Sequence, residues 1–510
     1  MNNFNFPFVK AHYRSDPASD PALNAYIEAM PELPDDLTLA RALRNLPRFD
    51  PAERLLPGPA RIQRLDLLQT LVVPLPRLIR LARAVIKLMH TGYSRRRPFS
   101  LEDNETLKLL YQQQQSGVFV SARQSGGGAN HSMALVGASG CGKSYGMRHI
   151  AGLFPPAIYH EQIGKWQLPS IFVEMPYDGE SLHTLASAIF AELDRLMPDA
   201  GYTELFEKGM NATRRLALAL SLAYKHGVGM IFVDEAQNQK SVGNVPTGRT
   251  LRNAGKTMPK NETPLMKLLI TASNTSNMPL CLSGTLEMQA VVGTRFSKSR
   301  RGSGRGSSQW LPLQSSGMLE APDEFELMLK ALWNYVWLQN VPVLNDGWVK
   351  LFFELTQGIP DIMVKLFESS QEAAIANRSE TLTEELVRSI FAKEFFLSEL
   401  GIIGLRDKNR YLLDIVPDLY QPDPLEAALE VSNETTNPRE DAAEDVEKVL
   451  LKAARRRERA VNPPKPVRKA PEPALVSVEL AAASDLRSST LGASGGERLN
   501  HVAMGAQTPS

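Results

Sequence analysis

One short stretch constrains this chain more than any other. Residues 135–150 read LVGASGCGKSYGMRHI, an apolar run typical of a buried strand followed by a sequence typical of a helix. Between the two, Gly140 and Gly142 allow the backbone to turn so that its N–H groups point inward. Lys143 and Ser144 follow where the helix would begin, so the positive end of the helix dipole, an ammonium and a hydroxyl meet. The stretch therefore predicts a site for phosphate groups.

The loop matches G-x-x-x-x-G-K-[ST] at every fixed position and has the strand-to-helix context that the motif requires. The alternative, a glycine turn that arose by chance, does not account for all of these matches. We expect Lys143 to reach the β- and γ-phosphates of a nucleotide and the Ser144 hydroxyl to ligate Mg²⁺. The residues predicted to bind the nucleotide are Gly137, Ala138, Ser139, Gly140, Cys141, Gly142, Lys143, Ser144 and Tyr145.

A second apolar run, GMIFVDEAQ at residues 229–237, ends in two acids. We expect Asp234 to hold Mg²⁺ through water and Glu235 to activate an attacking water as general base. An acid pair after a strand is a weak signal alone, and the phosphate loop strengthens it. The pair favours ATP hydrolysis over a kinase, which would transfer the phosphoryl group to an acceptor.

Two further elements suit the same chemistry. In PLCLSGT, residues 279–285, either Thr285 or Ser283 is placed to hydrogen-bond the γ-phosphate or the lytic water; the alternative is an ordinary turn after a strand. The basic segment that follows is a candidate source of an arginine finger, which stabilises transition-state charge on a neighbouring subunit's ATP. Arg295 is our first choice there, Arg300 and Arg301 compete with it, and a solvated basic loop is the alternative.

Five apolar runs alternate with helical segments in the middle of the chain, which predicts an α/β fold with a parallel sheet covered by helices on both faces. The expected strands are residues 132–137, 170–175, 229–235, 279–284 and 309–313. We place an N-terminal arm and helical extension at 1–105, the nucleotide-binding domain at 106–317, a helical lid at 318–415 and a mostly disordered tail at 416–510. The tail has too few apolar residues to fold alone.

Composition sets broader limits. The chain has 510 residues, is 43% hydrophobic and 22% charged, and carries a net charge of +1, as expected of a globular protein with several domains. Its two cysteines, Cys141 and Cys281, lie in the phosphate loop and in an apolar run, which favours a reduced, cytosolic setting. We expect neither a signal peptide nor a membrane span, because no uninterrupted apolar run reaches about 18 residues.

Together these pieces resemble the AAA+ ATPases, and within them the chain is similar to the TnsC-type regulators of Tn-seven-like transposons, relatives of TniB, IstB and MuB. The nucleotide motifs are common to all AAA+ proteins. More particular to TnsC are the pieces GYSRRRP (92–98), AIYHEQ (157–162), SRRGSG (299–304) and TQGIPDIMVKLF (356–367). The similarity spans roughly residues 10 to 420.

The resemblance implies an AAA+ sheet with a helical lid and a cytoplasmic, DNA-associated bacterial protein. Such proteins bind ATP and Mg²⁺ and assemble on double-stranded DNA as rings or helical filaments of identical subunits. They link a target-selector protein of the TniQ or TnsD type to the transposase, and ATP hydrolysis resets the assembly. Two alternatives remain: another AAA+ DNA ATPase, such as a replication initiator or helicase loader, and a nucleotide-gated scaffold with negligible turnover.

By the same resemblance, DNA contacts are expected at Lys208, Thr213 and Arg214, between the second and third strands. The basic segments at 240–261 and 295–305 compete with them, and each is equally well explained as a solvated loop. One departure from the family pattern lies in the lid. Asp361 follows Gly-Ile-Pro where many AAA+ lids carry an arginine, and Lys365, one turn further, is the candidate substitute.

Overall fold

The structure is a computed structural model. It describes residues 8–17, 20, 22–116, 132–177, 181–204, 210–238, 269, 273, 275–286, 288, 307–413, 416 and 418–419. These residues form two compact units, which we describe separately. Of the described residues, the first unit comprises those before Arg44 and those within Pro76–Leu311, and the second comprises Arg44–Leu75 and those from Pro312 to Leu419.

The first unit is built on a five-stranded, all-parallel sheet in the order β5-β6-β7-β2-β8. Its strands are β2 (Ser132–Gly137), β5 (Ser170–Glu174), β6 (Met230–Asp234), β7 (Leu280–Gly284) and β8 (Ser307–Trp310). The central strands β2, β6 and β7 are buried along their whole length, whereas the edge strand β5 alternates buried and more exposed residues. This pattern follows from helices covering both faces of a parallel sheet.

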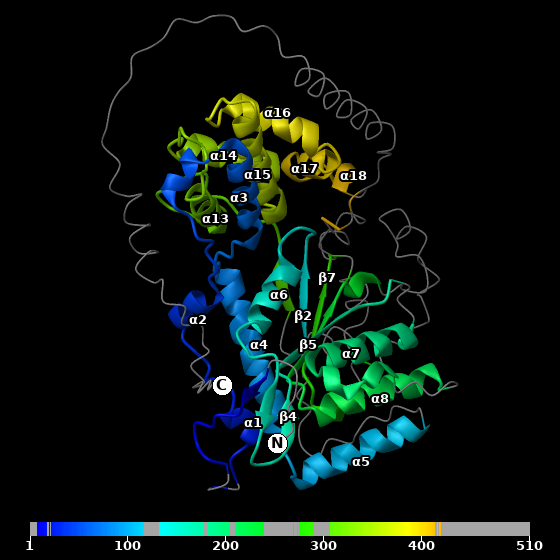
Figure 1. Cartoon of the computed structure of the whole chain (residues 1–510). Coiled ribbons are helices and arrows are strands. Elements are labelled where there is room, and N and C mark those ends of the chain that lie inside the picture. Colours follow the sequence, from blue (N-terminus) through cyan, green and yellow to red (C-terminus); the bar gives the residue numbers. More distant parts are fainter. Residues whose placement is uncertain are drawn as a thin grey trace, which may run out of the picture. The chain divides into compact units, whose positions relative to one another are not determined.

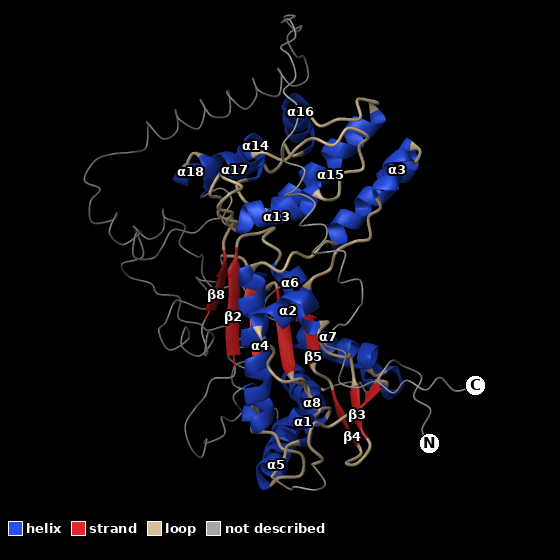
Figure 2. Cartoon of the chain, turned by 90° about the vertical axis from the view of Figure 1, so that its left-hand side faces the viewer, coloured by secondary structure: helices blue, strands red, loops and turns tan. Residues whose placement is uncertain are grey.

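Figure 1 shows α4 and α6 on one side of this sheet and α7 and α8 on the other, and Figure 2 views the α4 side. The helices of this unit are α1 (Ala25–Glu28), α2 (Asp36–Leu43), α4 (Pro76–Ser94), α5 (Leu101–Ser116), α6 (Lys143–Ala151), α7 (Leu182–Leu196) and α8 (Ala212–Lys225). Short 3-10 turns lie at Pro198–Ala200, Tyr202–Glu204 and Ala236–Asn238. The predicted α/β fold with a parallel sheet between helices is confirmed.

Local sequence explains several of these boundaries. Ser181 and Asn211 cap α7 and α8 by accepting hydrogen bonds from backbone N–H groups of the first turn. The fifth strand ends at Trp310, earlier than the predicted 309–313, because Pro312 has no N–H to donate to a ladder. A small second sheet, β1 (Val9–Lys10), β3 (Ile158–His160) and β4 (Lys165–Gln167), has no counterpart in our sequence analysis.

The second unit is helical. It contains α3 (Gly58–Leu65), α13 (Glu324–Trp333), α14 (Asp346–Thr356), α15 (Pro360–Ala376), α16 (Glu384–Glu394), α17 (Glu399–Arg406) and α18 (Arg410–Leu413), with 3-10 turns at Pro51–Leu55 and Asp66–Thr70. Phe325, Phe352 and Phe367 are fully buried in its core. Gly358 has φ +76°, and a Cβ there would lie 2.1 Å from the carbonyl oxygen of Leu313, so the Gly-Ile-Pro turn requires glycine.

Residues 44–75, which we assigned to the N-terminal extension, lie in this helical unit. The guanidinium of Arg61 donates two 2.6 Å hydrogen bonds to the carboxylate of Glu380 and a third, of 2.9 Å, to the carbonyl of Trp337. Leu65 and Leu68 are buried among the core residues of the same unit. An amphipathic helix carries no information about its partner, which is why the sequence did not predict this association.

Of the tail predicted at 416–510, only residues 416, 418 and 419 are among the described residues, and the rest falls outside them. Within the described residues, no helix combines the length and the apolar character needed to cross a bilayer.

Candidate functional site at the carboxyl edge of the sheet

The phosphate loop connects β2 to α6, as predicted. Gly140 and Gly142 have φ values of +73° and +81°, a backbone conformation that favours glycine. Gly137 is required for a different reason, because a Cβ there would lie 2.3 Å from the carbonyl oxygen of Trp310 on the neighbouring strand β8. The glycines therefore set both the shape of the loop and its close approach to the sheet.

The side chains of the loop take different positions. Lys143 is buried, and its Nζ donates to the carbonyl oxygens of Gly137 and Ala138 at 3.0 and 2.9 Å. Ser144 is half-buried in the first turn of α6. The ammonium and the hydroxyl thus lie on the loop where a helix N-terminus presents backbone N–H groups.

The remaining side chains of the loop are more peripheral. Cys141 is buried, which raises its pKa to about 11 and keeps it a neutral packing residue. Ser139 is half-buried. Tyr145 is exposed on α6 with its ring edge-on to His149, the ring centroids 4.4 Å apart.

The acid pair, Asp234 and Glu235, lies at the C-terminal end of β6. Asp234 is buried at the end of the strand, paired in register with Glu174 of β5. Glu235 follows with φ +54°, a left-handed conformation that is uncommon for a residue with a side chain. Its backbone N–H donates to Oδ1 of Asp234 at 3.0 Å, and its own side chain is exposed. The turn therefore gives two adjacent carboxylates different environments, one buried and one accessible.

Strand β7 lies between the loop strand and the acid strand. Ser283 pairs with Leu135 of β2, and Leu282 pairs with Val233 of β6, next to Asp234. In the part of the chain that the structure describes, Ser283 Oγ and Thr285 Oγ1 are buried and have no hydrogen-bond partner. Unsatisfied buried hydroxyls are costly, so these two are available to hydrogen-bond a polar ligand at this edge.

These residues fit a nucleotide with Mg²⁺. The glycine loop and α6 supply backbone N–H groups, Lys143 supplies a positive charge, and Ser144 and Asp234 supply the hard oxygen donors that Mg²⁺ prefers. The unsatisfied hydroxyls of Ser283 and Thr285 lie on the strand between the two motifs. The predicted residues thus meet at the carboxyl ends of parallel strands, where ligands bind in open α/β sheets.

One residue of the site was not predicted from the sequence. Gln237, in the short turn after β6, hydrogen-bonds through Nε2 to the carboxylate of Glu235. Its Oε1 accepts a 3.0 Å hydrogen bond from the backbone N–H of Thr285. No sequence motif predicts this pair of contacts, because it depends on β6 and β7 being neighbours.

The structure does not place several other predicted residues at this edge. Arg295, Arg300, Arg301, Lys208 and the basic segment 240–261 fall outside the described residues. Thr213 and Arg214 lie in the first turn of α8, where Nε of Arg214 donates to the carbonyl of Gln114 at 3.0 Å. Lys365 is in the helical unit and forms a 2.8 Å ion pair with Asp361.

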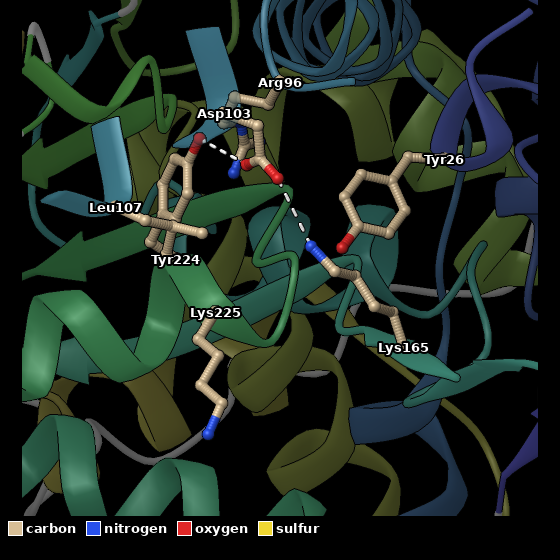
Figure 3. Close-up of a pocket in the computed structure, with 7 residues that line it drawn as sticks. All are labelled: Tyr26, Arg96, Asp103, Leu107, Lys165, Tyr224 and Lys225. Atoms are coloured by element: carbon tan, nitrogen blue, oxygen red, sulfur yellow. Dashed lines mark hydrogen bonds and ion pairs between the residues drawn. The ribbon is translucent and has the colours of Figure 1, made fainter. Parts of the chain in front are cut away.

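A small cavity of about 20 Å³, large enough for one water molecule, lies near the amino ends of the same strands. Figure 3 shows its lining, with Tyr224 and Lys165 both reaching Asp103. Arg96, from the GYSRRRP piece, is fully buried here and donates to the carbonyl of Val228 at 2.7 Å. Burial lowers the pKa of Arg96 from its ordinary value. Its hydrogen bonds to the carbonyls of Gly92 and Val228 join the end of α4 to the segment before β6, which is a structural role.

Comparisons with known proteins give one family match and several similar solved structures. Residues 128–292 match the family profile described as an AAA domain. Among curated proteins no match is found. Among solved structures the chain is similar to the Walker-type ATPase PABY2304 of Pyrococcus abyssi, with 15% identity and a TM-score of 0.33 over 71% of this chain and 91% of that one. It is also similar to Drosophila ORC bound to DNA, with 11% identity and a TM-score of 0.29 over 71% and 87%. The chain therefore matches an AAA domain over residues 128–292, and strands β2, β5, β6 and β7 of the parallel sheet lie within that range.

Proposed function

We propose that this chain is an ATP-dependent, DNA-binding regulator of transposition of the TnsC type. The observation that carries the ATPase part is the meeting of the glycine loop, the acid pair and two unsatisfied hydroxyls at one sheet edge. The finer assignment rests on the sequence pieces particular to TnsC. Three of them, GYSRRRP, SRRGSG and TQGIPDIMVKLF, lie outside the residues 128–292 that match the AAA domain.

In this proposal the chain's own residues divide the work. The loop N–H groups and Lys143 hold the phosphates, for which Lys143 gives up its hydrogen bonds to Gly137 and Ala138. Ser144 and Asp234 hold Mg²⁺, which neutralises charge on the β- and γ-phosphates when it is bound. Glu235, exposed beside the buried Asp234, accepts a proton from the attacking water.

Two more contributions complete the catalytic part. The hydroxyl of Thr285, or that of Ser283, donates to the γ-phosphate or the lytic water and so gains its missing partner. Arg295 of a neighbouring subunit supplies positive charge to the transition state, with Arg300 and Arg301 as the competing choices.

Hydrolysis serves as a timer in this proposal. The ATP-bound chain assembles on double-stranded DNA as a ring or filament and connects a selector of the TniQ or TnsD type to the transposase. Lys208, Thr213 and Arg214 are the proposed phosphate contacts, which makes binding salt-sensitive and indifferent to sequence. Hydrolysis then disassembles the complex.

Fluorescence anisotropy on a random-sequence DNA duplex tests the proposal. The duplex is titrated with protein in ATP, a slowly hydrolysed analogue, ADP and no nucleotide, each at two salt concentrations. Tight, salt-sensitive binding with the triphosphates alone is the expected result. Absence of binding in every nucleotide state would exclude a DNA-bound assembly and point instead to a phosphoryl acceptor.

Glu235→Gln distinguishes a protein in which ATP hydrolysis times release from DNA from a nucleotide-gated scaffold with negligible hydrolysis. The substitution keeps the size of the side chain and removes the base, so we expect hydrolysis to fall by about 10²-fold or more. Nucleotide affinity stays close to that of the wild type, and the DNA complex persists. Release from DNA as fast as in the wild type would rule out hydrolysis as the timer.

A further inference from the structure

A single side-chain amide joins two parts of the candidate site that come from different strands. On one side, Nε2 of Gln237 donates to a carboxylate oxygen of Glu235. On the other, Oε1 of Gln237 accepts the backbone N–H of Thr285 at 3.0 Å. Gln237 follows β6 and Thr285 follows β7, so the amide spans adjacent strand ends.

The surrounding backbone is shaped to admit this amide. A Cβ at Gly284 would lie 2.6 Å from Oε1 of Gln237, closer than real Cβ atoms approach, and 3.2 Å from the backbone nitrogen of Gln237, which is a tight contact. The left-handed turn at Glu235, with φ +54°, brings Gln237 back towards the carboxylate two residues before it. Only a residue without a Cβ at 284 leaves room for both contacts.

Thr285 also carries the unsatisfied Oγ1 hydroxyl at this edge, among the residues that the structure describes. Its backbone N–H is tied to Gln237, while its side chain has a hydrogen bond still to make. A ligand that hydrogen-bonds this hydroxyl therefore contacts Thr285, and the backbone N–H of Thr285 donates to the amide of Gln237. The amide in turn restrains the carboxylate of Glu235.

We propose that Gln237 is a positioning residue that couples Thr285 to Glu235, so that the carboxylate is oriented for catalysis when Thr285 contacts the γ-phosphate or the lytic water. The inference rests on the proposed ATPase function and adds a connection within its site. Gln237 itself touches neither phosphate nor water in this scheme; it acts through the two groups that it joins.

Hydrogen exchange in nucleotide-free protein tests the contact without turnover. In Gln237→Leu the N–H of Thr285 loses its acceptor, so the peptide that spans β7 and Thr285 gains faster exchange at about one amide. Gln237→Glu keeps an acceptor for this N–H, so its peptide exchanges as in the wild type. Asn238→Ala is the matched control, because Asn238 lies in the same turn but donates to the carbonyl of Met175 at 3.4 Å.

Kinetics tests the coupling. We expect Gln237→Leu and Gln237→Glu each to lower kcat about 10-fold with KM for ATP within about twofold, because both lose the donor to Glu235. Asn238→Ala stays within about twofold of wild type. Gly284→Ala adds a methyl group on the neighbouring strand β7 that displaces the Gln237 amide. It should reproduce the loss of kcat seen in Gln237→Leu.

A double-mutant cycle with Thr285→Val decides whether the residues act together. If Gln237 transmits the state of Thr285, the double variant loses less kcat than the product of the two single losses. Full multiplication of the losses overturns the inference, as does a wild-type or raised kcat in Gln237→Leu. Failure of the inference is distinguishable from failure of the proposed function, since the latter appears as unchanged hydrolysis in Glu235→Gln.

Discussion

The two ends of the same parallel sheet are built in opposite ways. At the amino ends, most polar groups are paired, although Nη2 of the buried Arg96 has no partner among the described residues: the hydroxyl of Tyr93, for example, donates to the carbonyl of Gly227 at 2.8 Å. The carboxylate of Asp103 accepts from the hydroxyl of Tyr224 at 2.8 Å, the backbone N–H of Phe99 at 3.0 Å and the ammonium of Lys165 at 3.3 Å. At the carboxyl ends, two buried hydroxyls have no partner within the described residues.

This difference suggests that the polar groups at the amino ends stabilise the fold, whereas those at the carboxyl ends bind a ligand. A polar cluster that is nearly satisfied within the chain stabilises the fold and needs no ligand. Unsatisfied groups beside a glycine loop cost stability in the free protein, and a ligand recovers that cost on binding. We therefore expect substitutions at the amino edge to change unfolding free energy, and substitutions at the carboxyl edge to change nucleotide binding and turnover.

The largest expected effect is that of Lys143→Ala. Removing the ammonium should abolish measurable ATP binding and lower hydrolysis by about 10²-fold or more, because positive charge at the phosphates is lost. The unfolding free energy should change by less than about 1 kcal/mol, since the hydrogen bonds from Lys143 to Gly137 and Ala138 are local to its own loop. Fluorescent-nucleotide binding and urea unfolding measure the two quantities.

Lys165→Ala is the matched control at the amino edge. It removes a lysine that pairs with Asp103 at 3.3 Å, and it should leave nucleotide affinity unchanged. A loss of ATP binding in Lys165→Ala as large as that in Lys143→Ala would show that the two edges do not differ in the way described.

Asp103→Ala is the second prediction. The substitution leaves the Tyr224 hydroxyl, the Phe99 N–H and the Lys165 ammonium without their shared acceptor. We expect a loss of about 3 kcal/mol or more in unfolding free energy, with kcat per folded molecule unchanged. Denaturant unfolding followed by circular dichroism measures the loss. Asp361→Ala, which breaks an exposed ion pair with Lys365, should cost less than about 1 kcal/mol.

The sequence predicted the carboxyl edge far better than the amino edge, and the reason is physical. The glycine loop and the buried strands are local patterns, so LVGASGCGKS and FVDE indicate both the elements and the site. The contacts of Arg96 with Val228 and of Asp103 with Lys165 join residues more than fifty positions apart, and no local pattern encodes such contacts. Gln237 could not be predicted for the same reason, since it requires β6 and β7 to be neighbours.

Short and amphipathic elements also escaped prediction. The strands of the small sheet have two or three residues each, too few for a period to be recognised. The helix around Arg61 is predictable as a helix, yet its pairing with Glu380 is not. The catalytic and binding roles assigned to the residues of the site remain predictions, as do those of Arg295, Lys208, Thr213 and Arg214.

The pH dependence of stability gives the third test, again at residues away from the loop. Burial lowers the pKa of both His160 and His226 from 6.5 to about 4. The folded state therefore prefers neutral imidazoles, so their contribution is fully present above about pH 6.5 and is lost as pH falls towards 4. We expect a decline of up to about 1.4 kcal/mol per pH unit for each histidine in that window.

Urea unfolding between pH 7 and pH 4.5 measures this decline, and His160→Gln should remove part of it. Neutral His160 donates from Nε2 to Oε1 of Gln167 and accepts from the Tyr13 hydroxyl at Nδ1, both at 2.9 Å. Equal slopes in the wild type and in His160→Gln would contradict the prediction. The affinity for nucleotide should not decline with pH in the way that the unfolding free energy does, in either the wild type or His160→Gln.

The smallest expected effect compares the removal of one oxygen at each edge. Tyr224→Phe deletes a hydroxyl that donates to Asp103 at 2.8 Å, so it should lower the unfolding free energy by about 1–2 kcal/mol. Ser283→Ala deletes a buried hydroxyl that has no partner in the described structure. Its removal relieves a desolvation cost, so nucleotide-free protein should be unchanged or more stable by up to about 1 kcal/mol.

With nucleotide bound, Ser283→Ala should become the more damaging of these two substitutions. A hydroxyl at 283 that contacts the phosphates or the lytic water is lost in Ser283→Ala, so the thermal stabilisation by saturating ATP with Mg²⁺ should shrink. Tyr224→Phe should keep the full stabilisation, because Tyr224 lies at the other end of the sheet. If Ser283→Ala lowers stability without nucleotide and leaves the ATP-dependent shift intact, Ser283 is a packing residue and Thr285 alone faces the ligand.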